Sequence, residues 1–344
     1  MGRPIRVLIV DDSAFTRHVL EKGLEADTGI TVVGKARDGV EALDQVAALE
    51  PDVITLDVEM PRMDGLTALR RIMKEHPTPV VMLSALTHKG ARETIQALMR
   101  GAVDFVPKPS TTLDIDRVME ELIAKVKIAA ITPVTPDYAR PAEPEPPPTT
   151  RVAPRAFRRG DPVLVIAAST GGPRALHQVL STLPGDLPAA VLLVQHMPPS
   201  FTRALAERLN KNSPLTVFEA ADGDRLARGL ALLAPGDFHL SFSNSKQLKL
   251  DQGPRRNGVR PSADVTMESA AVKHGKAVIG TVLTGMGSDG TDGARYVKAA
   301  GGKIIAEHES SSAVYGMPRS VIEAGLADRI VPLPEVAATI LELL

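Results

Sequence analysis

Short apolar runs alternate with amphipathic stretches along the first part of the chain. The apolar runs predict buried strands, and the stretches between them have the spacing of helices. Strands are expected at 7–10, 32–34, 53–56, 80–83 and 103–106, and helices near 14–25, 39–49, 65–75, 89–100 and 116–128. Such a regular succession of strand and helix predicts a parallel sheet with helices on both faces.

The alternation stops at a proline-rich segment. Residues 129–160 have no apolar period, and positions 146–148 are all proline. This composition favours an extended, polyproline-like linker over a folded element. We therefore expect one domain at 1–128 and another at 161–344. A proline-rich docking motif is the alternative interpretation of the segment.

A second strand–helix alternation follows the linker. Apolar strands are expected at 163–167, 190–195 and 277–283, and Pro173 suits the first turn of a helix that runs to about Leu183. The predicted fold class is α/β, with two doubly wound, mostly parallel-sheet domains joined by a Pro-rich linker.

The composition excludes several classes of function. The 344 residues include no cysteine, which excludes disulfides, thiolate catalysis and cysteine-based metal sites. A formal net charge of −1 gives no global basic field to recruit nucleic acid or an anionic membrane. No run approaches the roughly 20 apolar residues of a membrane span, and the first apolar run is too short for a signal peptide. We expect a cytoplasmic protein.

Polar residues follow the predicted strands of the first domain. Asp11 and Asp12 follow the first strand, Asp57 follows the third, Ser84 ends the fourth and Lys108 follows the fifth. The carboxyl ends of parallel strands meet at one sheet edge, where ligands bind. Neighbouring carboxylates raise each other's cost of ionisation, and a Mg²⁺ ion removes the conflict. The set predicts phosphoryl transfer to Asp57, with Lys108 and Ser84 contacting the phosphoryl oxygens.

These residues resemble the receiver domain of two-component response regulators. The resemblance is carried by VDDS at 10–13, DVEMP at 57–61, Ser84-Ala85 and PKP at 107–109. It implies phosphorylation of Asp57 by a histidine kinase, with Mg²⁺ held by Asp11, Asp12, Asp57 and the backbone of Glu59. It also implies that Phe105 is the switch aromatic, and an ordinary core phenylalanine is the alternative. A receiver is a switch, so the output must come from the second domain.

The sequence AASTGGP at 167–173 places Ser169 on a strand-to-helix loop. A phosphate-binding loop is disfavoured, because neither glycine-rich phosphate motif is present. Two interpretations remain open from this stretch alone. Ser169 is either the cap of the next helix or a nucleophile on an elbow in which Ala167 replaces the first glycine of Gly-x-Ser-x-Gly.

A nucleophilic serine needs a base, and the base needs an orienting acceptor. His196 ends the next apolar strand, and Asp289 lies in the loop 284–290 after the third. All three segments end at one sheet edge, so Ser169, His196 and Asp289 can meet. Asp292 is a rival, since spacing does not separate it from Asp289. The glycine-rich start of the loop either points backbone amides at an oxyanion or is only a flexible turn.

The second domain resembles the catalytic domain of the chemotaxis protein-glutamate methylesterases, the CheB family. The matching segments are AASTGGP, QHMP at 195–198, APG at 234–236 with His239-Leu240, PSAD at 261–264, LTGMGSDG at 283–290 and VYGMP at 314–318. The resemblance implies Ser169 as nucleophile, His196 as general base and then acid, and Asp289 as the orienting carboxylate. It further implies the Met286 backbone amide in the oxyanion hole and Thr170 in support.

The same resemblance implies a function and its partners. The enzyme would hydrolyse glutamate methyl esters, and deamidate glutamines, on methyl-accepting chemotaxis receptors, without a cofactor in the catalytic domain. Phosphorylation of the receiver would activate it. A response regulator that binds DNA or nucleotide without hydrolysis is the alternative. Against it, the second domain has no basic recognition helix and no phosphate loop.

Overall fold

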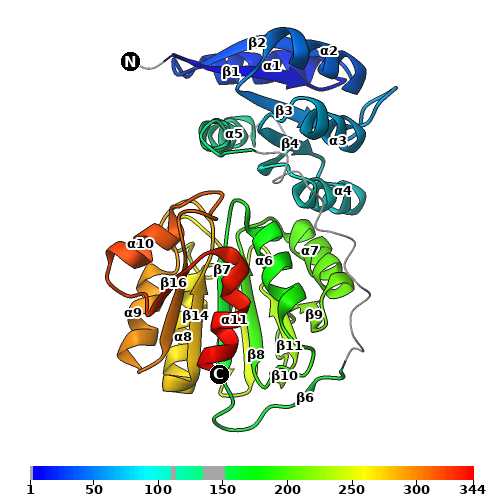
Figure 1. The fold of residues 1–344 in the computed structure, drawn as a ribbon. Coiled ribbons are helices and arrows are strands. Elements are labelled where there is room, and N and C mark those ends of the chain that lie inside the picture. The colour runs from blue at the N-terminus through cyan, green and yellow to red at the C-terminus, as the bar shows by residue number, and fades with distance from the viewer. Residues whose placement is uncertain (1–2, 110–113, 135–151) are drawn as a thin grey trace. The chain divides into compact units, whose positions relative to one another are not determined.

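The chain divides into two compact units, residues 1–144 and 145–344 (Figure 1). The computed structural model describes residues 3–109, 114–134 and 152–344. Residues 135–151 of the predicted linker, including its run of prolines at 146–148, lie outside these described residues. Each unit is built around a parallel sheet, so the predicted α/β class is confirmed.

The first unit contains a five-stranded parallel sheet in the order β2-β1-β3-β4-β5. Its strands are β1 (Ile5–Val10), β2 (Ile30–Ala36), β3 (Val53–Asp57), β4 (Val80–Ser84) and β5 (Asp104–Pro107). Its helices are α1 (Ala14–Glu25), α2 (Gly39–Leu49), α3 (Gly65–Glu75), α4 (His88–Met99) and α5 (Ile115–Ala129). Helix α1 packs against α5, while α3 packs between α2 and α4. Every strand and helix expected in this part of the sequence is present.

Polar side chains fix where the helices of the first unit begin. The hydroxyl of Ser13 accepts a hydrogen bond from the first turn of α1, and the carboxylate of Asp38 does so for α2. Asp64 and Thr87 cap α3 and α4 in the same way. Such caps satisfy amides that have no partner within the helix. They anchor the strand-to-helix loops that surround the carboxyl edge of the sheet.

The second unit contains a seven-stranded sheet in the order β16-β15-β14-β7-β8-β11-β9, and all of its pairs are parallel. Its strands are β7 (Val163–Ala168), β8 (Ala190–Gln195), β9 (Thr216–Glu219), β11 (Leu230–Leu233), β14 (Val278–Val282), β15 (Lys303–Glu307) and β16 (Arg329–Val331). Two antiparallel ribbons pair β6 (Arg155–Ala156) with β10 (Ala227–Arg228), and β12 (His239–Asn244) with β13 (Gln247–Asp251).

The helices of the second unit connect these strands. They are α6 (Gly172–Thr182), α7 (Pro199–Asn212), α8 (Ala263–His274), α9 (Thr291–Ala299), α10 (Met317–Glu323) and α11 (Leu333–Leu343). Across the described ranges of the chain, none of the helices is long and apolar enough to cross a membrane.

The strand order of the second sheet reverses between β7 and β14. The chain leaves β7 toward β8 on one side, and later returns to add β14 on the other side. Loops at such a reversal diverge and leave room for a ligand at the carboxyl ends of the strands. The segment after β7 contains Ser169, and the segment after β14 contains residues 284–290. The topology therefore brings two of the predicted site segments together.

Part of the predicted linker packs onto the second unit. Residues 155–156 form the short strand β6, and Phe157 is buried in the same core as Val163 and Leu226. Burial of a phenylalanine side chain is worth about 1.5–3 kcal/mol, which accounts for this attachment. The second unit therefore includes chain on the N-terminal side of residue 161.

Candidate functional sites

The acidic residues of the first unit converge at the carboxyl edge of its sheet. Asp11 follows β1 and Asp57 ends β3, and these two strands are paired in parallel. One carboxylate oxygen from each of Asp11, Asp12 and Asp57 lies within 4.8 Å of the other two. Asp11 and Asp57 are buried, whereas Asp12 is exposed. This is the arrangement that the strand-end argument predicts.

Lys108 lies between the two buried carboxylates of this cluster. Its Nζ is 2.8 Å from Asp11 Oδ2 and 2.8 Å from Asp57 Oδ2. Burial raises the pKa of Asp57 to about 6, and the charges of Asp11 and Asp12 add to the rise while Lys108 opposes it. A hard cation with oxygen ligands would relieve this repulsion, and the carboxylate set fits Mg²⁺.

The other predicted residues of the first unit lie on neighbouring elements. Ser84 ends β4 beside β3, and its buried hydroxyl donates to the carbonyl of Gly90 over 3.2 Å. The ring of Phe105 is buried in β5, with Lys125 Nζ 5.1 Å from its centroid. The side chain of Glu59 pairs with Lys89. The switching role of Phe105 and the metal-binding role of the Glu59 backbone stay predictions.

Ser169 lies directly after β7, at the reversal of the second sheet. Its amide donates to the carbonyl of Thr284 over 3.0 Å, and its carbonyl accepts from Gln195 Nε2 over 2.8 Å. Helix α6 begins after Gly171, which has a φ of 76° and is the N-cap residue. Ser169 is therefore not the helix cap, and its backbone is held by both neighbouring strand ends.

His196 follows β8 and contacts a buried carboxylate. Its Nε2 is 2.8 Å from Asp289 Oδ2, and the two side chains are 12% and 3% exposed. The amide of His196 also donates to the carbonyl of Ala168, next to Ser169. Because Nε2 faces the carboxylate, we assign the proton of the neutral ring to Nε2. Nδ1 is then the nitrogen that can accept a proton.

Asp289 is surrounded by hydrogen-bond donors. Oδ1 accepts from the Ser262 hydroxyl over 2.7 Å and from the Asp264 amide over 3.2 Å, and Oδ2 accepts from the Ala263 amide over 2.6 Å. Burial alone would raise the pKa of Asp289, but the bonds from His196, Ser262 and Ala263 bring it down to about 2. Asp289 is therefore an anion fixed against His196 at neutral pH.

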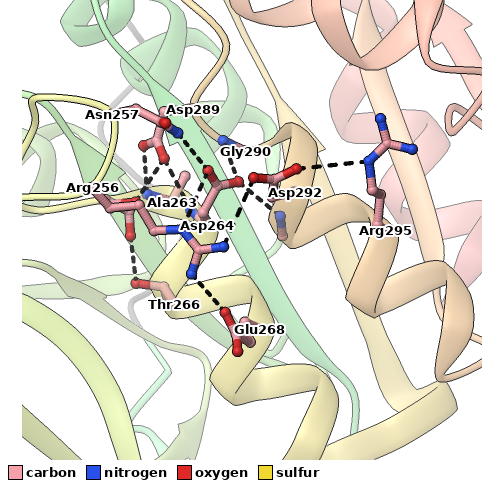
Figure 2. Close-up of polar contacts among 12 residues, drawn as sticks. Arg256, Asn257, Ala263, Asp264, Thr266, Glu268, Asp289, Gly290, Asp292 and Arg295 are labelled. Carbon is pink, nitrogen blue, oxygen red and sulfur yellow. Dashed lines mark hydrogen bonds and ion pairs between the residues drawn. The ribbon is translucent and has the colours of Figure 1, made fainter.

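The rival aspartate points elsewhere. The Asp292 side chain is 56% exposed, with its oxygens 3.7 Å from Arg295 and 3.9 Å from Arg256 (Figure 2). It lies in the first turn of α9, whereas Asp289 lies in the loop before that helix. The structure thus separates two carboxylates that the sequence spacing leaves equivalent, and it brings Asp289 to the histidine.

The loop after β14 passes directly against Ser169. A Cβ atom on Gly285 would lie 2.8 Å from Ser169 Cβ and 2.4 Å from Met317 Sδ, so only glycine fits without displacing its neighbours. The Gly285 amide donates to the carbonyl of Val314 over 3.0 Å. This close approach brings the next residue, Met286, to the sheet edge that carries Ser169. Preorganised amides in such a place can stabilise an oxyanion.

A buried network that sequence reasoning missed supports this loop. Glu307, fully buried at the end of β15, accepts from the Thr284 amide over 2.7 Å. The Thr284 hydroxyl in turn donates to the carbonyl of Thr170 over 2.9 Å. Burial raises the pKa of Glu307, although the amide bond opposes the rise. The sequence signal for this role was a glutamate that directly follows the apolar residues 304–306.

The PSAD segment at 261–264 also supports the site in a way that the sequence did not indicate. It matched the family motif, but no role was assigned to its residues. Ser262 and the first amides of α8 hold Asp289, and Asp264 is itself fully buried nearby. The signal available in the sequence was an aspartate directly after Pro-Ser-Ala at the start of a helix.

A serine, a histidine and a buried aspartate at the reversal of a parallel sheet are the parts of a serine hydrolase, and the acidic cluster of the first unit is typical of a receiver domain. The family model for the CheB methylesterases matches residues 164–340, and that for response regulator receiver domains matches residues 7–120. The chain belongs to the CheB methylesterase family.

Relatives match along nearly the whole chain. The protein-glutamate methylesterase/protein-glutamine glutaminase of Symbiobacterium thermophilum is 50% identical over 98% of this chain and 96% of its own length. The protein of the same name from Pyrococcus horikoshii is 45% identical over 99% and 94%. The crystal structure of the Thermotoga maritima CheB methylesterase catalytic domain is 46% identical, with a TM-score of 0.52, and covers 53% of this chain and 98% of that domain. The family predicted from the motifs is confirmed.

Proposed function

We propose that this chain is a phosphorylation-activated protein-glutamate methylesterase that also deamidates glutamines. It acts in the cytoplasm, and its substrates are methyl-accepting chemotaxis receptors. The observation that carries the proposal is the 2.8 Å contact between His196 and the buried Asp289, at the sheet edge where Ser169 follows β7. The names and extent of the relatives support the same activity.

The proposed reaction is acyl transfer through Ser169. Nδ1 of His196 accepts the hydroxyl proton while Oγ attacks the side-chain carbonyl of the esterified glutamate. Asp289 stabilises the imidazolium that forms, and the Met286 amide donates to the oxyanion. Thr170 supports this loop through the bond between its carbonyl and Thr284. His196 then protonates the departing methanol.

Water completes the reaction. His196 takes a proton from the water that attacks the acyl-enzyme, and returns it to Ser169 as the ester bond breaks. The product is a glutamate side chain. Glutamine follows the same steps, with ammonia in place of methanol as the leaving group. No cofactor enters these steps.

The first unit supplies the proposed regulation. We assign residues 1–128 to the receiver, 129–160 to the linker, whose residues 155–157 pack onto the second unit, and 161–344 to the catalytic domain. A histidine kinase phosphorylates Asp57, and Asp11, Asp12, Asp57 and the Glu59 carbonyl would hold a Mg²⁺ that neutralises phosphoryl oxygens when bound. Lys108 and Ser84 contact the phosphoryl group, and Phe105 responds to it. The added charge of nearly −2 biases the equilibrium of the tethered domains.

Methanol release from membranes that contain methylated receptors tests the activity. The full chain should release methanol, and should release it faster with a small phosphodonor. Ser169→Ala should lose nearly all turnover, whereas Ser181→Ala, at the far end of α6, should not. A serine-directed phosphonate should label Ser169 alone. A labelled wild-type preparation that releases neither methanol nor ammonia would contradict the proposal.

A further inference from the structure

Asp264 caps a helix to which it does not belong. It is the second residue of α8, and its side chain is completely buried. Its Oδ1 accepts hydrogen bonds from the amides of Gly290 over 2.9 Å and Gly293 over 2.7 Å. These amides lie at the start of α9, where backbone N–H groups have no partner within the helix. The carboxylate of Asp264 therefore anchors α9 to the neighbouring helix (Figure 2).

Asp289 makes the reciprocal contact. It immediately precedes the N-cap of α9, and it accepts from the amides of Ala263 and Asp264 at the start of α8. Each helix is thus capped by an aspartate associated with the other. A carboxylate at a helix N-terminus also interacts favourably with the helix dipole. Displacement of either carboxylate therefore loosens the residue that holds the other one.

The packing leaves little freedom for another arrangement. A Cβ on Gly293 would lie 2.7 Å from Met267 Cβ and 2.9 Å from Asp264 Cα, so the backbones of α8 and α9 are close together. Gly290 has a φ of 95°, in the left-handed region that glycine adopts without strain. The turn between Asp289 and α9 is therefore set by the position of α9.

We infer that Asp264 is a positioning residue for the His196–Asp289 pair. By fixing the start of α9, it fixes the loop in which Asp289 meets both the Ala263 amide and His196 Nε2. The inference rests on the proposed function of that pair and adds to it a residue that acts through Asp289. Small displacements of such a carboxylate are costly, because catalytic hydrogen bonds depend on alignment.

A separate turn completes the surroundings of Asp264. Arg256 and Val259 exchange backbone hydrogen bonds around Asn257 and Gly258, which both have positive φ. An Asn-Gly pair is typical of such a tight turn. The turn delivers Asn257 Nδ2 to Asp264 Oδ2 at 2.8 Å. The other contacts of this carboxylate are with donors or with the cation Arg256, and only the carboxylate of Asp289 adds a neighbouring negative charge.

Burial makes the ionised form of Asp264 unfavourable. Burial raises its pKa to about 6, and the neighbouring charge of Asp289 adds to the rise. Arg256 opposes it, with Nε 4.0 Å from Asp264 Oδ2, but Arg256 is shared with Glu268 and Asp292. An asparagine could cap α9 without this cost. Because Asp264 lies next to Asp289, which contacts His196, its negative charge also stabilises an imidazolium at His196.

Two substitutions in the full-length chain separate position from charge. Asp264→Ala removes both caps of α9, and we expect kcat to fall on the order of 10²-fold with KM changed far less. Asp264→Asn keeps an oxygen for the two amides, and Asn257 can turn its amide to accept from the new nitrogen. We expect Asp264→Asn to recover most of kcat.

The pH profile tests the role of the charge. The groups facing Asp264 are Asp289 and Arg256, and through them His196, Glu268 and Asp292. Removing the anion in Asp264→Asn makes the imidazolium of His196 less stable. The acid limb of kcat/KM should therefore move to lower pH than in the wild type. A residue that serves folding alone would leave the limb in place.

A control and a readout independent of turnover complete the test. Asp328 accepts from the Ile304 amide over 2.8 Å and from Lys298 Nζ over 2.6 Å, at the opposite end of β15. Asp328→Ala should lower stability and leave kcat and the pH profile unchanged. The NMR resonance of the proton on His196 Nε2 should shift upfield in Asp264→Ala, because its bond to Asp289 weakens.

The outcomes distinguish the inference from the proposed function. Folded Asp264 variants with wild-type kcat, an unmoved acid limb and an unshifted His196 resonance would overturn the inference. Should Asp264→Ala fail to fold, the pH profile of Asp264→Asn decides, and an acid limb at the wild-type pH would overturn the inference. If the wild type releases no methanol but its His196 resonance responds to Asp264, the positioning role stands and the proposed function fails.

Discussion

The orientation of one imidazole ring decides which nitrogen can act as a base. His196 meets Asp289 through Nε2, so Nδ1 is the nitrogen left to accept a proton in the proposed reaction. The carboxylate fixes both the ring and its tautomer, and it stabilises the charged form that appears during turnover. Its acceptor capacity is filled by donors from the start of α8 as well as by the ring. Asp289 cannot rotate without breaking several bonds.

Asp289→Asn should therefore reduce kcat on the order of 10⁴-fold, as in other serine–histidine–aspartate sites. The amide group either presents N–H to the ring or favours the wrong tautomer. Asp292→Asn is the matched control, since Asp292 contacts only arginines among the described side chains. It should retain nearly full methanol release. The assignment of the acid is wrong if Asp292→Asn is the crippling change instead.

Asp264 also makes the stability of the folded chain depend on pH. Its pKa is about 6 when folded, against an ordinary value of 3.8, so the folded state binds the additional proton between these values. The contribution of this group to the free energy of unfolding therefore falls as pH rises from about 4 to about 6. Asp289, with its pKa lowered to about 2, contributes its change below this window.

Denaturant unfolding between pH 4 and pH 6 tests whether the free energy of unfolding falls as the pH rises. The wild type should lose about 1–3 kcal/mol relative to Asp264→Asn between pH 4 and pH 6, because only the wild type releases this proton on unfolding. All other titrating groups, including Asp57, are the same in the two proteins, so their contributions to the pH dependence cancel in the difference. Parallel stability curves for the two proteins would rule out the raised pKa of Asp264.

At the scale of elements, the ends of β7, β8, β14 and β15 assemble the site. Parallel pairing brings these ends to one edge, and the reversal between β7 and β14 opens it. Glu307 at the end of β15 holds the Thr284 amide, and Thr284 accepts the Ser169 amide on its carbonyl. Glu307, the last residue of β15, therefore supports the backbone of Ser169 through Thr284.

Glu307→Ala should lower the free energy of unfolding by about 1–3 kcal/mol, because it leaves a buried amide without its acceptor. It should also lower kcat, since the loop next to Ser169 loses its support. Glu307→Gln is the control, because its carbonyl oxygen can accept from Thr284 while Ser311 accepts from its nitrogen. Unfolding curves and methanol release check both effects. An alanine variant as active as the glutamine variant would refute the supporting role.

The elements differ in how well the sequence predicts them. The strands that carry the site are continuous apolar runs, so their positions and their common edge could be read from the pattern. Strand β16, with exposed Arg329 and Ile330, and the short β6–β10 ribbon have no such run. Their pairing depends on tertiary contacts, and the sequence did not reveal it.

The same distinction holds within the site. Ser169, His196 and Asp289 could be nominated because each follows an apolar strand. Asp264 and Glu307 could not be assigned a role, since their partners are backbone amides on other elements. Backbone groups carry no sequence signature. The choice between Asp289 and Asp292 likewise depended on where α9 begins.

At the scale of the whole molecule, two folded units are connected by a proline-rich chain. A tether of this kind holds two domains at about millimolar effective concentration, so even a weak contact between them is populated. The proposed activation by phosphorylation would follow if the unphosphorylated receiver restrains the catalytic domain. The attachment of Phe157 to the second unit indicates where a separable catalytic fragment should begin.

A fragment of residues 152–344 should therefore release methanol faster than the intact unphosphorylated chain. It keeps β6 and Phe157, and the catalytic domain of the Thermotoga maritima relative was crystallised separately. Phosphorylation should raise methanol release by the intact chain to nearly the rate of the fragment. The matched control is the intact Asp57→Ala variant, which a phosphodonor should not activate. A folded fragment that is slower than the intact chain, or equal to it, argues against restraint by the receiver.

The exchange of caps between α8 and α9 has a consequence for local unfolding. Neither helix can fray at its first turn without releasing a carboxylate that the other requires, so the two ends should open as one cooperative unit. Amide hydrogens of Ala263, Asp264, Gly290 and Gly293 should then exchange with solvent deuterium at a common rate, much slower than ordinary helix starts. On heating, activity should be lost in a single step, because no partly opened form would keep His196 aligned with Asp289.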